Sequence, residues 1–149
     1  MATHTEHLEA EFGVSAGSLR LLLTLDLASV DDVSVSAARG LVEADDDDLL
    51  LLAAATGRDR VDVLEDLAHV DPSDFEVDAV RLAAILVALD DGFDEWEIAA
   101  IRSQFGDPED MERTSPHFAE ADSSYLGPEA ETRAVVEALR SRLRQSPSG

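Results

Sequence analysis

The stretch LAAILVALDDGFDEWEIAAIRSQF, residues 82–105, decides the fold. It begins with eight apolar residues at 82–89, a run typical of a buried helix. The chain then turns at Asp90-Asp91-Gly92. A second helix follows with acids in its first turn, and its apolar residues recur on one face at Ile98, Ile101 and Phe105. The stretch therefore predicts two helices joined by an acidic turn.

The rest of the chain has the same helical character. Aliphatic residues dominate, Gly and Pro fall between apolar runs, and no long alternation of apolar and polar residues indicates a strand. At 149 residues the chain is long enough for one domain with its own core. We expect an all-α protein, a single compact bundle of about six to seven helices around a buried central helix at about Phe75–Leu89.

Capping residues and helix breakers give the expected boundaries. A polar N-terminal segment at 1–14 precedes a single all-α domain at 15–145, and 146–149 form a tail. Within the domain, 107–127 is expected to be a long irregular loop and 128–145 the C-terminal helix, opened by Pro128. Further helices are expected at 6–12, from Ser15 or Ser18 to Leu27, from Ser34 or Ser36 to Val42, and at 49–55, 59–68 and 94–105. Asp45–Asp48 either cap the helix that follows them or bind a cation.

The charge is extreme. The formal net charge is −22, from 33 acids against 11 Arg, with no Lys at all. One interpretation is adaptation to high salt, where salt screens the repulsion between carboxylates. The other is an acidic surface that meets a basic partner or imitates nucleic acid. Both argue against direct binding of DNA or RNA, because phosphate contacts need a basic face.

Composition excludes several classes of site. The chain has no Cys, so it has no disulfide, no thiolate metal site and no Cys nucleophile. No secretory signal is visible at the N-terminus. The longest apolar run is far shorter than the roughly 20 residues that span a bilayer, so we expect no membrane span and a cytoplasmic protein.

The candidate metal ligands lie in the acidic turn. Carboxylate oxygens are the ligands that Ca²⁺ and Mg²⁺ prefer. The candidates are Asp90, Asp91, Asp94 and Glu97. The turn is not an EF-hand, because placing Gly92 at loop position 6 puts an apolar residue at both ends of the loop. The alternative interpretation is an acidic helix cap, with Asp94 and Glu97 forming a capping box.

No residue stands out as catalytic. Trp96 is either an anchor in or beside the core or a stacking surface for a ligand. The four His residues are scattered, at His4, His7, His69 and His117. No phosphate-binding loop, nucleophile elbow or zinc-protease pattern occurs, so we expect no enzyme and no certain cofactor.

The segment 86–101 resembles the TerB-like tellurite-resistance family. Asp91-Gly92 matches the Asp-Gly turn of that family, and Glu97 matches the Glu that opens its next helix. The intervening segment is one residue shorter, and Leu89-Asp90 stands where Ala is usual. A faint second copy at Leu25–Val42 lacks the Gly and the Glu. The resemblance, over about residues 19–106, implies a compact helical bundle with an acidic cation-binding patch and a role in stress response or as an accessory module.

The sequence thus predicts a non-enzymatic, acidic helical accessory or interaction module with a weak Ca²⁺ or Mg²⁺ patch. The alternative is an acidic inhibitor or immunity-type protein that binds a basic partner surface. Both hypotheses expect a protein partner, and both are compatible with a homodimer.

Overall fold

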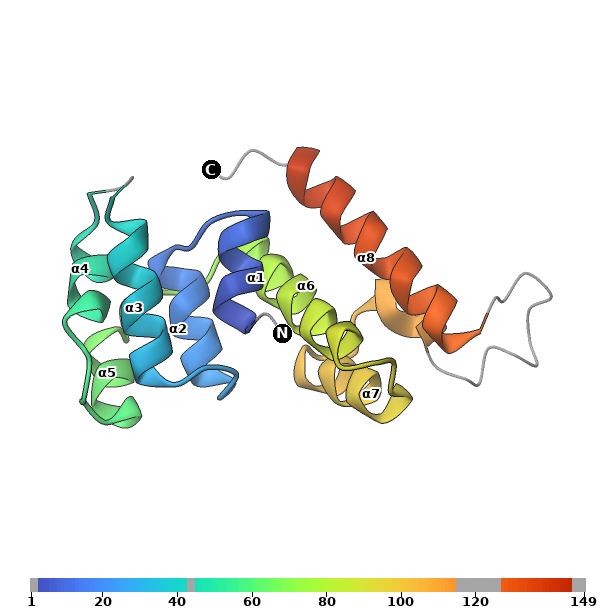
Figure 1. Ribbon diagram of the computed structural model, residues 1–149, viewed down its shortest axis with the longest axis horizontal. Helices are drawn as coiled ribbons and strands as arrows, with labels where there is room; N and C mark the ends of the chain where they lie inside the picture. The colour runs from blue at the N-terminus through green and yellow to red at the C-terminus, as the bar shows by residue number, and fades with distance from the viewer. Residues whose placement is uncertain (1–2, 43–44, 115–126, 146–149) are drawn as a thin grey trace. The chain divides into compact units, whose positions relative to one another are not determined.

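The chain is all-α, as predicted. The computed structural model describes residues 3–42, 45–114 and 127–145 (Figure 1), and these contain eight α-helices, one 3₁₀-helix and no strand. The elements are α1 His4–Glu11, α2 Ala16–Thr24, α3 Val30–Gly40, α4 Asp47–Ala53, α5 Arg60–Asp66, α6 Asp74–Asp90, α7 Glu95–Gln104, η1 Glu109–Thr114 and α8 Pro128–Gln145.

The predicted central helix is confirmed as a long buried helix. In α6, Val80, Leu82 and Ile85 are completely buried. The internal contacts of the chain divide it into two units, residues 2–83 and 84–149, and the division falls within α6. The prediction of one domain over 15–145 stays a prediction.

The first unit, residues 2–83, is built around α2. This helix contacts α3, α4 and α5, and α3 also packs along α4 and against α1. The side chains between these helices are aliphatic and at most 2 % exposed: Leu19, Leu22, Leu23, Val33, Ala37, Leu49, Leu52, Val63 and Leu67. Burial of the apolar stripe of each helix is therefore what holds this unit together.

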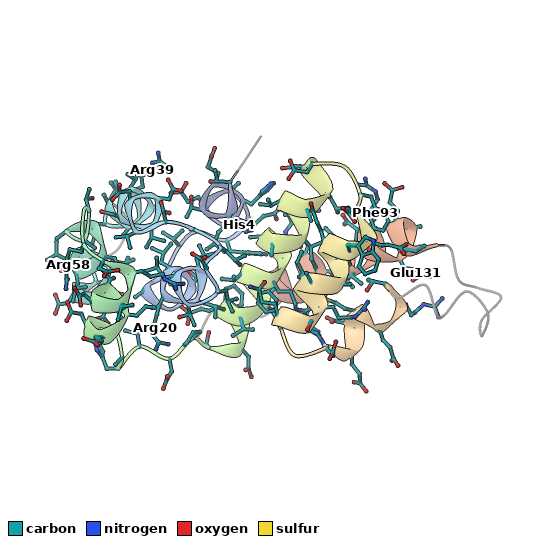
Figure 2. The ribbon with its side chains drawn as sticks, turned by 90° about the horizontal axis from the view of Figure 1, so that it is seen from below. His4, Arg20, Arg39, Arg58, Phe93 and Glu131 are labelled. Carbon is teal, nitrogen blue, oxygen red and sulfur yellow. The ribbon has the colours of Figure 1, made fainter. Side chains whose placement is uncertain are left out.

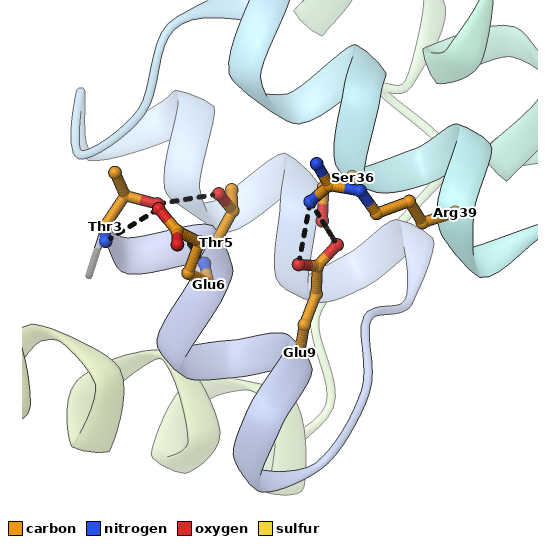
Figure 3. A network of polar contacts seen from close by, with 6 residues as sticks. All are labelled: Thr3, Thr5, Glu6, Glu9, Ser36 and Arg39. Atoms are coloured by element: carbon orange, nitrogen blue, oxygen red, sulfur yellow. Dashed lines mark hydrogen bonds and ion pairs between the residues drawn. The ribbon is translucent and has the colours of Figure 1, made fainter.

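The N-terminal segment forms α1 and is tied to α3. The hydroxyl of Thr3 accepts from the backbone N–H of Glu6, whose carboxylate accepts from the N–H of Thr3, so a capping box starts the helix two residues before the expected position. Glu9 accepts from the Ser36 hydroxyl at 2.9 Å and from Arg39 Nη1 at 3.1 Å (Figure 3).

Two helix starts in this unit test the capping predictions. The start predicted at Ser34 or Ser36 is wrong: α3 begins at Val30, because Ser29 accepts from the N–H of Asp32 and places two acids in the first turn. The cap predicted at Asp45–Asp48 is confirmed. Asp46 accepts from the N–H groups of residues 48 and 49. Both starts follow from side-chain acceptors that satisfy free N–H groups.

The carboxylate of Glu76 connects the starts of α6 and α2. It accepts from the backbone N–H of Ser73 at 2.9 Å and from the hydroxyl of Ser15, the N-cap of α2. Gly17 lies directly against it, since a Cβ on Gly17 would overlap both carboxylate oxygens. One carboxylate thus serves two helix N-termini, where negative charge is favourable.

The second unit, residues 84–149, contains α7, η1 and α8, which contact one another. The prediction of an irregular loop over 107–127 is wrong for 109–114, which form η1 with Met111 completely buried. Residues 115–126 lie outside the described residues. Arg113 donates to both carboxylate oxygens of Glu131, at 3.2 and 3.0 Å, and so joins η1 to α8. The predicted C-terminal helix is confirmed as α8.

Candidate functional site

The segment that joins α6 to α7 forms the predicted acidic turn, which we define as residues 90–97. Asp90 ends α6, and Gly92 has φ +97°, a conformation that favours glycine. Phe93 lies beside α7 (Figure 2). The carboxylate of Asp94 accepts from the N–H of Trp96 at 2.9 Å and caps α7. The turn and the helix start are therefore where the sequence predicts them.

The capping box predicted for Asp94 and Glu97 is only half present. Asp94 caps the helix, but the carboxylate of Glu97 makes no hydrogen bond with any described residue. A single aspartate is sufficient to start α7, which leaves the Glu97 carboxylate available for other contacts.

Trp96 is not buried, so its predicted role as an anchor in or beside the core is wrong. Its exposed fraction is 82 %, whereas Ile98 and Ile101 of the same helix are buried. The reason is geometric: residues two apart on a helix point to opposite sides, so burial of Ile98 turns Trp96 outward. The exposed side of α7 continues with Ala100 and Ser103, which are too small to cover an indole ring.

The carboxylates beside Trp96 carry uncompensated charge. Asp91, Glu95 and Glu97 are exposed, and none of their carboxylates has a hydrogen bond or ion pair with any residue that the structure describes. Other acids of the same unit are paired with Arg: Asp107 with Arg102, Asp110 with Arg142, Glu129 with Arg133, Glu131 with Arg113 and Glu137 with Arg140. The acidic turn is thus a local excess of negative charge around an exposed aromatic ring.

The four predicted metal ligands are close in sequence, but they are not assembled as a ligand set. Over residues 3–42, 45–114 and 127–145, no three His, Cys, Asp or Glu side chains are grouped as they would be in a preformed metal centre. Asp94 is already engaged as the cap of α7. Cation binding at Asp90, Asp91, Asp94 and Glu97 stays a prediction, and it requires these side chains to rearrange.

The histidines have separate environments. His4 lies in α1, where burial and the neighbouring His7 lower its pKa below the ordinary 6.5. His69 follows α5, and its Nε2 lies 2.8 Å from a carboxylate oxygen of Asp48 in α4, so this pair joins two elements of the first unit. His117 lies outside the described residues.

The missed feature of the site is the exposure of Trp96. The signal available in the sequence was its position two residues before Ile98, which starts the buried face of the helix.

In the part of the chain that the structure covers, no helix has the length and apolar character needed to cross a membrane. No family model matches the chain, and no curated protein and no solved structure matches it either.

Proposed function

We propose that the chain is a cytoplasmic, non-enzymatic, acidic helical interaction module of TerB-like type, which binds a basic protein surface through the acidic turn. The observation that carries the proposal is the 82 % exposure of Trp96 beside the carboxylates of Asp91, Glu95 and Glu97, which have no partner in the described residues. Exposed Trp residues are common centres of protein interfaces, and unpaired carboxylates favour a cationic partner.

The magnitudes support an interface centred on this ring. Covering an indole removes roughly 150–200 Å² of surface from water, which at about 25 cal/mol per Å² amounts to about 4–5 kcal/mol before the costs of association. Positive charge near Asp91, Glu95 and Glu97 also relieves repulsion in a chain of net charge −22. Trp96 supplies the apolar contact, and the carboxylates supply orientation and association rate.

Affinity capture from host lysate at low and moderate salt tests the proposal. The parent and Trp96→Ala serve as baits. Val61→Ala is the matched control, because Val61 is also an exposed apolar residue, at 57 %, but lies in α5. We expect a basic protein that the parent and the Val61 variant retain and that Trp96→Ala loses. Recovery of no basic protein, or equal recovery by all three baits, would refute the assignment.

We include a weak divalent-cation site in the proposal, at Asp90, Asp91, Asp94 and Glu97. Several hard oxygen donors within eight residues suit Ca²⁺ or Mg²⁺, and the absence of a preformed group predicts weak binding. Thermal unfolding of the parent and of an Asp91→Ala, Glu97→Ala double variant is compared with and without millimolar Ca²⁺ or Mg²⁺ at constant ionic strength. Identical responses of the two proteins would remove the cation site from the proposal.

A second candidate is an acidic inhibitor or immunity-type protein. The observation that favours it is the concentration of a net charge of −22 in 149 residues, which suits occlusion of a basic active site. The two candidates differ in what happens to the captured partner. An inhibitor abolishes the partner's activity at a one-to-one ratio, whereas an accessory module leaves that activity intact.

A further inference from the structure

We propose that Trp96 is a docking point for an arginine side chain of the basic partner, with the guanidinium stacked on the indole and held among the carboxylates of the acidic turn. This inference rests on the proposed function and specifies the chemistry of the contact. It selects arginine over lysine, and it places the contact on the exposed side of α7.

The Trp96 ring is free of contacts that could replace a ligand within the part of the chain that the structure describes. Trp96 has no ring contact and no cation partner among the residues that the structure describes. The same side of α7 carries Ala100 and Ser103, one turn or two turns further on, and their small side chains leave the ring open. An indole face is the best aromatic surface for a cation.

The second unit does not place a cation of its own on the ring. The chain has no Lys, and five Arg of this unit pair with carboxylates outside the acidic turn: Arg102, Arg113, Arg133, Arg140 and Arg142. Arg102, the only Arg of α7, donates to the hydroxyl of Thr114 at 3.0 Å and lies 3.8 Å from a carboxylate oxygen of Asp107. These pairs hold the five Arg side chains away from Trp96, so we expect the cation on the ring to come from another molecule.

The charge around the ring is complementary to a cation. Glu95 and Glu97 flank the indole in sequence, Asp91 lies in the same acidic turn, and the carboxylates of all three lack partners in the described part of the chain. A guanidinium can stack on the ring through its planar face while its N–H groups point outward to carboxylates. Lysine offers a compact, strongly hydrated ammonium that cannot do both. A second copy of this chain is disfavoured as the occupant, since it brings the same negative charge.

Two peptides of equal length and charge test the inference, one alternating Arg with Ser and the other alternating Lys with Ser. Trp96 is the only Trp in the chain, so its fluorescence reports the site directly. Calorimetry measures the affinity of the variants. We expect the Arg peptide to change Trp96 emission and to bind about three- to fivefold more tightly than the Lys peptide. Trp96→Leu is expected to remove this preference and to weaken binding of the Arg peptide by a similar factor.

A Glu95→Gln, Glu97→Gln double variant is the matched control. It is expected to weaken both peptides and to reduce the salt dependence of binding, while the preference for Arg remains. These variants leave the core intact, because all three side chains are exposed, and circular dichroism checks that they fold.

The outcomes separate the inference from the proposed function. If neither peptide binds, the basic-partner proposal fails and the inference fails with it. If both peptides bind equally and Trp96→Leu has no effect, the basic surface is bound but arginine stacking is refuted. A change of Trp96 emission with protein concentration alone would place a second copy on the ring and would also overturn the inference.

Discussion

Substitution of Gly17 by Ala tests whether Glu76 holds the starts of α2 and α6 together. Gly17 lies in the first turn of α2, and a Cβ there would overlap both oxygens of the Glu76 carboxylate. Glu76 is a flexible side chain, so the carboxylate is expected to move rather than the backbone. Its movement breaks the contact with the Ser15 hydroxyl and strains the 2.9 Å hydrogen bond from the N–H of Ser73.

The magnitude is the difference between two terms. Replacing Gly by Ala in a helix is favourable by up to about 1 kcal/mol. A hydrogen bond to a charged group contributes about 1.5–3 kcal/mol, and the lower end applies because Glu76 is only partly buried. Loss of one bond and weakening of the other outweigh the gain in helix propensity. We expect Gly17→Ala to lower the free energy of unfolding of the parent by about 1–2 kcal/mol.

The sign is expected to reverse when Glu76 is absent. In a Glu76→Ala background the three atoms nearest to this Cβ are removed, so Gly17→Ala is expected to raise the free energy of unfolding by up to about 1 kcal/mol. The coupling between the two positions is then about 1.5–3 kcal/mol. Glu76→Gln is the matched control, because it keeps the shape of the side chain and should retain most of the conflict with Ala at position 17.

Urea unfolding followed by circular dichroism measures the four corners of this cycle. Urea is preferred to guanidinium chloride, because an ionic denaturant would screen the repulsion in a chain of net charge −22. Fluorescence of Trp96 reports separately on the second unit. If Gly17→Ala is equally destabilising with and without Glu76, some other contact requires glycine at this position and the reasoning is refuted.

Three further predictions concern stability. Arg113→Ala is expected to lower the free energy of unfolding by about 2 kcal/mol, and by more than Glu131→Ala does, because it removes two charge-assisted hydrogen bonds from Glu131, a residue that is only 8 % exposed. Urea midpoints of both variants show whether this order holds. The pKa of His4 is lowered in the folded state, so below pH 6.5 the unfolded chain binds more protons at this residue than the folded chain does. The free energy of unfolding should therefore fall as the pH drops below this value, and His4→Gln should make that fall smaller. Equal pH profiles of the two proteins from about pH 7.5 to about pH 5.5 would contradict the prediction. Asp26→Gly is expected to raise the free energy of unfolding by about 1 kcal/mol, because Asp26 holds φ +57° just after α2, a conformation that favours glycine. Its exposed ion pair with Arg60, at 3.7 Å, contributes little. An unchanged or lower urea midpoint would show that this ion pair matters.

Local sequence signals predicted most of the fold. Apolar runs located the helices, and side-chain acceptors located their starts, as at Ser15 and at Asp46, where acids also follow the cap. The start of α3 was missed because Ser29, Ser34 and Ser36 are all plausible caps, and only packing selects among them. Ser34 and Ser36 are instead buried inside the helix, where they bind α4 and α1 neighbours.

Contacts between distant residues could not be predicted in this way. Glu76 and Ser15 are 61 positions apart, and in a chain with 33 acids nothing in the sequence marks this carboxylate. The 3₁₀-helix was missed because it has a single apolar core residue, Met111, whose neighbours in the sequence are charged, so no apolar pattern marks the helix. For the candidate site, the turn and the cap at Asp94 were predicted, and the outward direction of Trp96 could have been deduced from the predicted apolar face of α7, which Ile98 and Ile101 form.

The two interpretations of the acidity predict opposite effects of salt: adaptation to high salt predicts that salt favours the working state, and a basic partner predicts that salt weakens binding. A contact made directly by Trp96 would allow both to hold. Eleven Arg cannot pair one-to-one with 33 acids, so screening should stabilise the folded chain. The same screening weakens attraction to a basic partner. At molar KCl the Debye length is about 3 Å, so only groups in direct contact still attract one another. An indole stacked on a guanidinium is such a contact. In a chain adapted to high salt, binding should therefore depend more on Trp96 and less on Glu95 and Glu97 as KCl rises.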